Sequence, residues 1–159
     1  MTERRTQLAM AMFLVAEAVF FFLLILAFIY FRVPGAVKLN VGAGALDTVC
    51  LLGSVLTIWR ATTGSRKWLS ATILFGGLFL AGQGAQYLRL IHDGVNISQG
   101  LFGTTFFTLA GAHGLHVLVG LIALVIVPGT AIRSMALYWS FLTIVWLVIF
   151  LIAYIWAAR

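Results

Sequence analysis

The chain has 159 residues, of which 63% are hydrophobic and only 9% are charged, and its formal net charge is +6. A water-soluble domain carries roughly a quarter charged residues, so this composition excludes an ordinary soluble domain and indicates an integral membrane protein. The positive charge does not predict binding to nucleic acid, because the basic residues lie at the ends of apolar segments, where they orient helices and contact lipid headgroups.

Five apolar segments are each long enough to cross a bilayer, which takes about 20 residues. We predict an all-α integral membrane bundle of five transmembrane helices in a single domain, residues 1–159. The connections are short, so we expect successive helices to be antiparallel neighbours. The basic start resembles a signal peptide, but the apolar segment after it is too long and has no cleavage site, so we expect an uncleaved first helix. The predicted helices cover about 8–31, 41–59, 68–91, 101–127 and 136–157.

Lys and Arg residues are unevenly shared between the two sides of this predicted bundle. Six basic residues lie on the N-terminal side and four on the other side, which favours an N-terminus inside the cytoplasm and a C-terminus outside. Arg89 lies one turn from the outer end of its helix and can extend to a lipid phosphate. The N-terminal side collects Arg4, Arg5, Arg60, Arg66, Lys67 and Arg133, and the other side Arg32, Lys38, Arg89 and Arg159. Aromatic residues near the predicted ends, where the membrane interface is expected, are Trp68, Tyr87, Tyr138 and Trp156.

The segment 100–127 has no Asp, Glu, Lys or Arg and yet places two imidazoles at mid-depth. His113 and His116 are three residues apart, so they project from neighbouring positions on one helical face. At about 1.5 Å per residue, Glu17 lies roughly 13 Å and His116 roughly 16 Å from the inner ends of their helices. A charge at mid-membrane is costly unless it is paired or hydrated. We therefore expect a hydrogen bond or ion pair between Glu17 and His116, which either locks the packing or handles protons.

Polar residues of the second and third helices predict further contacts inside the bundle. Gln83, Gln86 and Tyr87 share one face, and we expect interhelical hydrogen bonds worth under ~1 kcal/mol each. Asp47 lies several residues into the second helix, where it faces a protein partner or caps the helix in the headgroup region. Cys50 has no intrachain partner and is expected to be a small buried side chain.

His113, His116 and Glu17 have the ligand types of a metal site with two histidines and one carboxylate. However, the chain has only three histidines, and the third, His92, lies in a predicted loop, so a haem and a copper cannot both be ligated. The sequence contains no Ser–His–Asp arrangement, phosphate loop or CxxC motif. We therefore predict no catalytic residue, no bound cofactor and no metal on this chain.

The segment GLFGTTFFTLAGAHGLHVLVG (100–120) resembles the signature of subunit III of haem-copper oxidases of the cytochrome c oxidase type. The last predicted helix, with YWSFLTIVWLVIF (138–150), is similar to the final helix of that family. AEAVFFF (16–22) resembles its segment with a buried glutamate before paired phenylalanines. Gln83, Gln86 and Tyr87 match a glutamine-and-tyrosine stretch of the family. The mitochondrial form has seven helices, and this chain matches the last five.

Three positions depart from the family pattern. Gln86 stands where the family usually has an acid, and Ser140 and Thr143 replace a histidine and an aspartate of the final helix. The roles of those charged groups are therefore not carried over, whereas Glu17, His113 and His116 match.

The resemblance implies a non-catalytic subunit of a terminal oxidase in aerobic respiratory electron transport, located in the bacterial cytoplasmic (inner) membrane. It implies contact with the catalytic subunit I, which holds the haem and copper, with other oxidase subunits and with phospholipids. It also implies that the chain stabilises subunit I and supports proton uptake or oxygen access. An accessory subunit of a quinol oxidase or nitric oxide reductase is an alternative. A stand-alone proton or solute carrier and an assembly factor are alternatives of other classes.

Overall fold

The computed structural model describes residues 2–31, 39–94, 101–126 and 131–156, and almost all of them are helical. Five segments of this described part are long and apolar enough to cross a membrane, so the predicted all-α membrane bundle is confirmed. The protein is thus a multi-pass membrane protein. The helices are α1 (Thr2–Tyr30), α2 (Val41–Ala61), α3 (Arg66–His92), α4 (Leu101–Ile126) and α5 (Ile132–Ile149), which a π-helical segment, η2 (Phe150–Trp156), continues.

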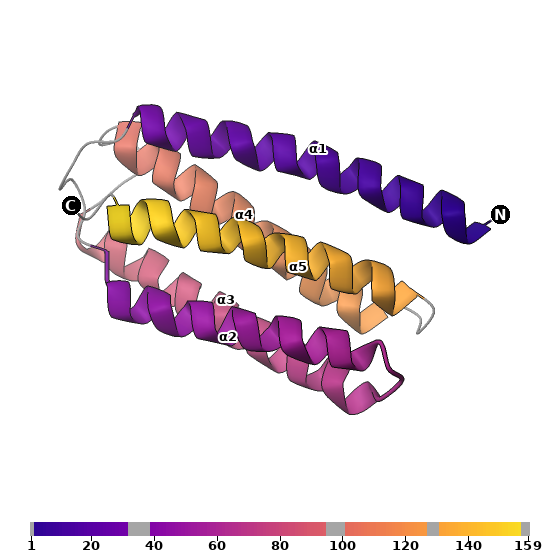
Figure 1. The fold of residues 1–159 in the computed structure, drawn as a ribbon. Helices are drawn as coiled ribbons and strands as arrows, with labels where there is room; N and C mark the ends of the chain where they lie inside the picture. Colours follow the sequence, from indigo (N-terminus) through magenta and orange to yellow (C-terminus); the bar gives the residue numbers. More distant parts are fainter. Residues whose placement is uncertain (1, 32–38, 95–100, 127–130, 157–159) are drawn as a thin grey trace.

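The helices are arranged around α5, which packs against α1, α2 and α4, while α3 packs against α2 and α4 (Figure 1). The two chain ends lie at opposite ends of the bundle (Figure 1). The expectation that successive helices are neighbours is wrong for the first pair, because α1 packs against α4 and α5 whereas α2 packs against α3 and α5. The helix α5 lies between α1 and α2 and packs against both.

Several predicted helix ends differ from the observed ones. The helix α1 begins at Thr2, although its apolar membrane span begins at Gln7, close to the predicted residue 8, and α5 begins at Ile132, one turn before the predicted start. With this earlier start Tyr138 lies inside α5, and its side chain is buried in the bundle. The predicted ends at residues 127 and 157 and the basic residues Arg32, Lys38 and Arg159 lie outside the described residues.

Small residues let the helices approach closely. A Cβ atom on Gly44 of α2 would lie only 2.7 Å from Tyr154 Cε1, and one on Gly76 of α3 would lie 2.7 Å from Trp139 Cζ2. Such distances leave no room for a side chain, and close approach of this kind is how membrane helices gain packing energy without a hydrophobic driving force. These two glycines therefore set how deeply the large aromatics of α5 and η2 enter the bundle.

Three hydrogen bonds from indole N–H groups to hydroxyls join α2 to α5. Trp139 Nε1 donates to Ser54 Oγ at 2.7 Å and Trp146 Nε1 donates to Thr48 Oγ1 at 2.9 Å. Nearer the other end of the pair, Trp59 Nε1 of α2 donates to Ser140 Oγ of α5 at 3.0 Å. The Trp139 and Trp146 indoles are buried, whereas Trp59 is exposed. A buried indole N–H needs an acceptor, so the two buried bonds fix the rotation of α5 about its own axis and thereby the faces it presents to α1 and α4.

Candidate functional site

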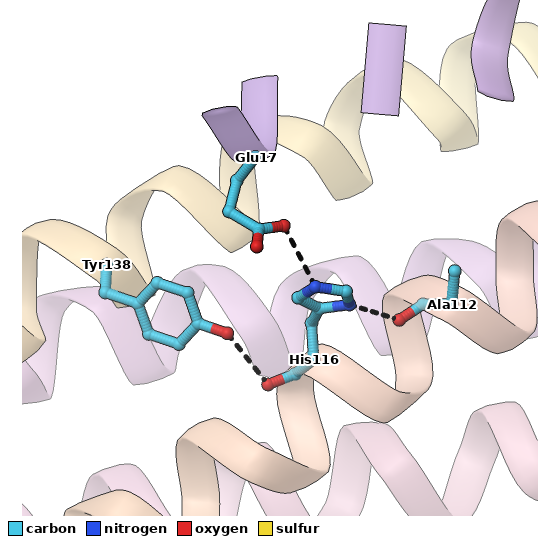
Figure 2. Close-up of polar contacts among 4 residues, drawn as sticks. All are labelled: Glu17, Ala112, His116 and Tyr138. Atoms are coloured by element: carbon cyan, nitrogen blue, oxygen red, sulfur yellow. Dashed lines mark hydrogen bonds and ion pairs between the residues drawn. The ribbon is translucent and has the colours of Figure 1, made fainter. Parts of the chain in front are cut away.

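The structure brings Glu17 of α1 and His116 of α4 into contact, as their matched depths predict. Glu17 Oε2 lies 2.9 Å from His116 Nε2 (Figure 2), and the two side chains are 18% and 21% exposed. The two atoms are within the distance of an ion pair, but Glu17 Oε2 has no hydrogen-bond partner among the described residues. The carboxyl and the imidazole therefore satisfy each other mainly through electrostatics at the seam between α1 and α4.

Three further contacts hold His116, and Figure 2 shows the two that are hydrogen bonds. Its Nδ1 lies 2.7 Å from the carbonyl oxygen of Ala112, one turn earlier on α4. The Tyr138 hydroxyl of α5 donates to the His116 carbonyl oxygen at 3.3 Å. The ring of Phe21, one turn after Glu17, meets the His116 ring edge-on with centroids 5.1 Å apart. Residues from α1, α4 and α5 thus hold the imidazole so that only Nε2 faces the carboxyl.

His113 turns away from this pair. Its ring is 1% exposed and stacks on the Trp146 indole, with centroids 5.5 Å and planes 27° apart, while Phe79 and Phe21 meet it edge-on. Neither ring nitrogen has a hydrogen-bond partner among the described residues. The two histidines are neighbours on the helix as expected, but His113 is enclosed by aromatic rings and only His116 reaches Glu17. Within the described residues no group of three or more His, Cys, Asp or Glu side chains could hold a metal.

A second polar cluster lies between α2, α3 and η2, towards the end of the bundle at which the chain ends. Gln83 Nε2 and Gln86 Nε2 both donate to Asp47 Oδ2 at 2.7 Å, and the Tyr154 hydroxyl donates to Gln86 Oε1 at 3.0 Å. Asp47 is only 5% exposed. A Cβ atom on Gly82 would overlap its carboxylate. Of the two roles expected for Asp47, the structure therefore shows the contact inside the bundle, on which four side chains converge.

Tyr154 was missed as a member of this cluster in the sequence analysis. Tyr154 lies in η2, where the wider turn of a π-helix departs from the 3.6-residue period on which helical faces are predicted. Tyr154 is 1% exposed and its ring packs against Phe150 and Trp146. A tyrosine eight residues after Trp146 on the same predicted face was the only available signal.

Other singled-out residues lie away from both clusters. The Tyr87 hydroxyl donates to the Phe107 carbonyl oxygen of α4 at 3.4 Å, and the two rings are 4.5 Å apart. Arg89 is exposed on α3 near its C-terminal end, and Cys50 is half-buried rather than buried. The contact of Arg89 with lipid phosphate stays a prediction.

Hydroxyls of α2 were missed by the sequence analysis. Thr48 and Ser54 accept the indole bonds from α5, and Thr57 Oγ1 lies 2.8 Å from Thr72 Oγ1 of α3. All four side chains are buried. Ser54 and Thr57 lie three residues apart on neighbouring positions of α2, and this spacing is the signal that could have found them, since small polar residues are typical of helix–helix contacts in membranes.

Relatives with similar sequences carry a common name, although no family model matches the chain. The cytochrome c oxidase subunit 3 of Corynebacterium diphtheriae is 34% identical over 140 residues, which cover 76% of this chain and 68% of the relative. The probable cytochrome c oxidase subunit 3 of Nocardia farcinica is 34% identical over 141 residues, covering 76% and 70%. The subunit 3 of a Synechocystis species is 29% identical over 172 residues, covering 91% and 72%. The chain belongs to the cytochrome c oxidase subunit 3 family.

Proposed function

We propose that this chain is a non-catalytic subunit III of a haem-copper terminal oxidase in aerobic respiratory electron transport. The observation that carries the proposal is the 34% identity to subunit 3 proteins over 76% of the chain. The five-helix bundle agrees with it, since the matched helices pack around α5 as one unit. As a member of this family the chain is part of an oxidase complex.

The partner that we propose is the catalytic subunit I, which would hold the haem and copper. In this chain the two membrane-embedded histidines engage different helices, because His113 stacks on Trp146 of α5 while His116 contacts Glu17 of α1. The two imidazoles do not face one common position for a metal ion. This arrangement supports the proposal that the chain carries no redox centre of its own. Phospholipids and other oxidase subunits are the remaining partners that we propose, with Arg89 contacting a lipid phosphate.

Two contributions to the complex follow from the two polar clusters. The cluster around Asp47 is buried and joins three elements of the bundle, so its role is to hold the helices together. The Glu17–His116 pair lies at the seam between α1 and α4, where the two side chains keep about a fifth of their surface while Glu17 Oε2 itself is buried. We assign support of proton uptake to this pair, and oxygen access is the alternative contribution of the subunit.

Deletion of the gene tests the function, with oxygen consumption followed through sustained turnover. We expect assembly of a haem-bearing complex whose activity declines faster than that of the parent, and complementation with the intact gene should restore the rate of decline.

Glu17→Gln separates the roles, because a faster decline or slower proton uptake supports the proton role and unchanged behaviour supports packing alone. A chain that purifies without a haem-bearing partner and carries protons into vesicles by itself would instead be a stand-alone carrier. An assay of which electron donor reduces the complex distinguishes a cytochrome c oxidase from a quinol oxidase.

The location that we propose is the bacterial cytoplasmic (inner) membrane, with the N-terminus inside. The excess of basic residues on the N-terminal side supports this orientation. A single cysteine at Thr6, in a Cys50→Ser background, tests it by labelling with a membrane-impermeant thiol reagent. Labelling only after the membrane is opened agrees with the proposal, and labelling of intact spheroplasts contradicts it.

A further inference from the structure

We propose that the seam between α1 and α4 is a docking surface for a membrane-spanning helix of a neighbouring oxidase subunit, which donates a hydrogen bond to the second carboxyl oxygen of Glu17. The inference rests on the proposed function for the presence of such a subunit, and it deepens that function by naming the surface through which the chain is held. It is carried by one polar atom, Glu17 Oε1, and by the side chains around it.

The two oxygens of the Glu17 carboxyl have different surroundings. Oε2 is buried and lies 2.9 Å from His116 Nε2 (Figure 2). Oε1 is not among the buried side-chain atoms that lack a partner, and no described residue donates a hydrogen bond to it. The Glu17 side chain as a whole keeps 18% of its surface. The exposed oxygen of the carboxyl is therefore Oε1, an acceptor that the described part of the chain leaves without a donor.

Glu17 lies near the middle of its membrane span, where lipid does not supply a donor. The span is Gln7–Tyr30, so about 15 Å of helix lies on one side of Glu17 and about 20 Å on the other. Headgroups do not reach this depth, since the hydrocarbon core is about 30 Å thick. Acyl chains have no hydrogen-bond donor, and a polar group that faces them is costly. A donor that belongs to a protein is therefore expected beside Oε1.

The side chains around the pair present an apolar surface. Phe13 and Phe20, one turn before and one turn after Glu17, are each 45% exposed. The Phe20 ring contacts the His116 ring with centroids 5.9 Å apart, so it lies at the edge of the seam. On α4, Val119 follows His116 by one turn and is 52% exposed. The surface thus has one polar atom at its centre and an apolar rim, which fits a helix that carries a single donor among apolar side chains.

A second copy of this chain does not supply the missing donor. In a symmetric pair the same surface patch meets itself, and two copies inserted in the same orientation place equal residues at equal depth. Glu17 would then lie opposite Glu17, which brings two acidic groups together and adds no donor of another kind. The partner is therefore a different chain, and its donor is a hydroxyl, amide, indole or guanidinium group.

Photo-crosslinking of the assembled oxidase tests the surface. Benzoylphenylalanine incorporated at Phe20 replaces one half-exposed ring by another and reports what lies against the seam. The matched control is the same probe at Phe22, which is 60% exposed and, two residues further on, projects from the other side of α1. We expect the probe at Phe20 to crosslink to a membrane-spanning segment of another oxidase subunit, with a higher yield than the probe at Phe22.

Three results would overturn the proposal: a probe at Phe20 that reacts only with lipid, one that reacts with a second copy of this chain, or a yield no higher than that at Phe22. If the chain with the probe at Phe20 does not assemble, the probe at Val119 examines the same surface from α4. A chain that purifies without any haem-bearing partner contradicts the proposed function. A chain that copurifies with the partner, but whose Phe20 probe finds only lipid, contradicts this inference alone.

The crosslinked peptide also identifies the donor, which can then be replaced in the partner by a side chain of similar shape that cannot donate. This chain stays unaltered, so its own folding does not confound the result. We expect release of this chain from the complex in detergent to become about threefold more favourable, which corresponds to the ~0.6 kcal/mol of a hydrogen bond between membrane helices. Unchanged release would show that Glu17 Oε1 is not the atom that the partner contacts.

Discussion

The two histidines of α4 should respond in opposite ways to the same substitution. In His116→Leu the Glu17 carboxyl loses its partner at mid-membrane. In His113→Leu the ring that disappears has no hydrogen-bond partner on either nitrogen among the described residues. Because the substitutions are chemically identical and lie three residues apart on one helix, each variant is the control for the other.

The magnitudes follow from these surroundings. Removing one partner of an ion pair in a poorly solvated site leaves an uncompensated group, so we expect His116→Leu to lower the free energy of unfolding by about 3 kcal/mol. His113→Leu removes two unsatisfied buried nitrogens, a gain of about 1–3 kcal/mol for each. It also loses three ring contacts, with Trp146, Phe79 and Phe21, a loss of roughly 0.5–1.5 kcal/mol for each, so the two effects nearly cancel. We therefore expect His113→Leu to stay within about 1 kcal/mol of the parent, on the stabilising side.

Titration of the purified complex with a denaturing detergent measures the difference. The folded fraction of this subunit can be followed by limited proteolysis and immunoblotting of a tag. We expect the midpoint of His116→Leu to fall clearly below that of the parent and the midpoint of His113→Leu to match or exceed it. Equal losses in the two variants, or a larger loss for His113→Leu, would refute the assignment of Glu17 to His116 alone.

Three further predictions concern packing inside the bundle, and the same titration measures each of them. Gly76→Ala should lower the free energy of unfolding by about 1–3 kcal/mol, because its Cβ would lie 2.7 Å from the Trp139 ring. Gly77→Ala is the control, because a Cβ there has nothing within 4 Å, and it should be neutral or stabilise by about 0.5–1 kcal/mol. Equal effects of the two variants would contradict this packing. Asp47→Leu should lower the free energy of unfolding by about 2 kcal/mol, because it leaves two glutamine amides without their acceptor. Asp47→Asn keeps an accepting oxygen, so its loss should be less than half as large. A larger loss for the asparagine variant would show that the negative charge itself is needed. The double-mutant cycle of Trp139→Phe and Ser54→Ala should give a coupling of about 0.6–1.7 kcal/mol, and additive effects would show that the indole bond contributes nothing.

The sequence could predict those contacts in each cluster that depend only on how far along its helix a residue lies. Glu17 and His116 were matched because the rise per residue converts sequence position into depth in the membrane, and the structure places them 2.9 Å apart. The shared face of Gln83 and Gln86 also follows from helical period, and both amides bind Asp47.

Rotation about the helix axis could not be predicted in this way. His113 and His116 share a face on any helical projection, yet one is enclosed by aromatic rings and the other contacts Glu17. Which neighbour stands opposite each histidine depends on how α5 separates α1 from α2, and the separation in turn depends on contacts between residues far apart in the chain. Tyr154 was missed because η2 departs from the α-helical period.

By itself the sequence determined that this chain is a membrane bundle of five apolar helices, and it predicted how far along its helix each polar side chain lies, because hydrophobic length and rise per residue are local properties of the chain. Only the tertiary structure decided which of these side chains meet. Helices in lipid are held by close contacts at small residues and by a few hydrogen bonds, such as those of Gly76 and Trp139, and these set the rotation and the neighbours of every helix. The pairing of Glu17 with His116 and the isolation of His113 are consequences of that packing.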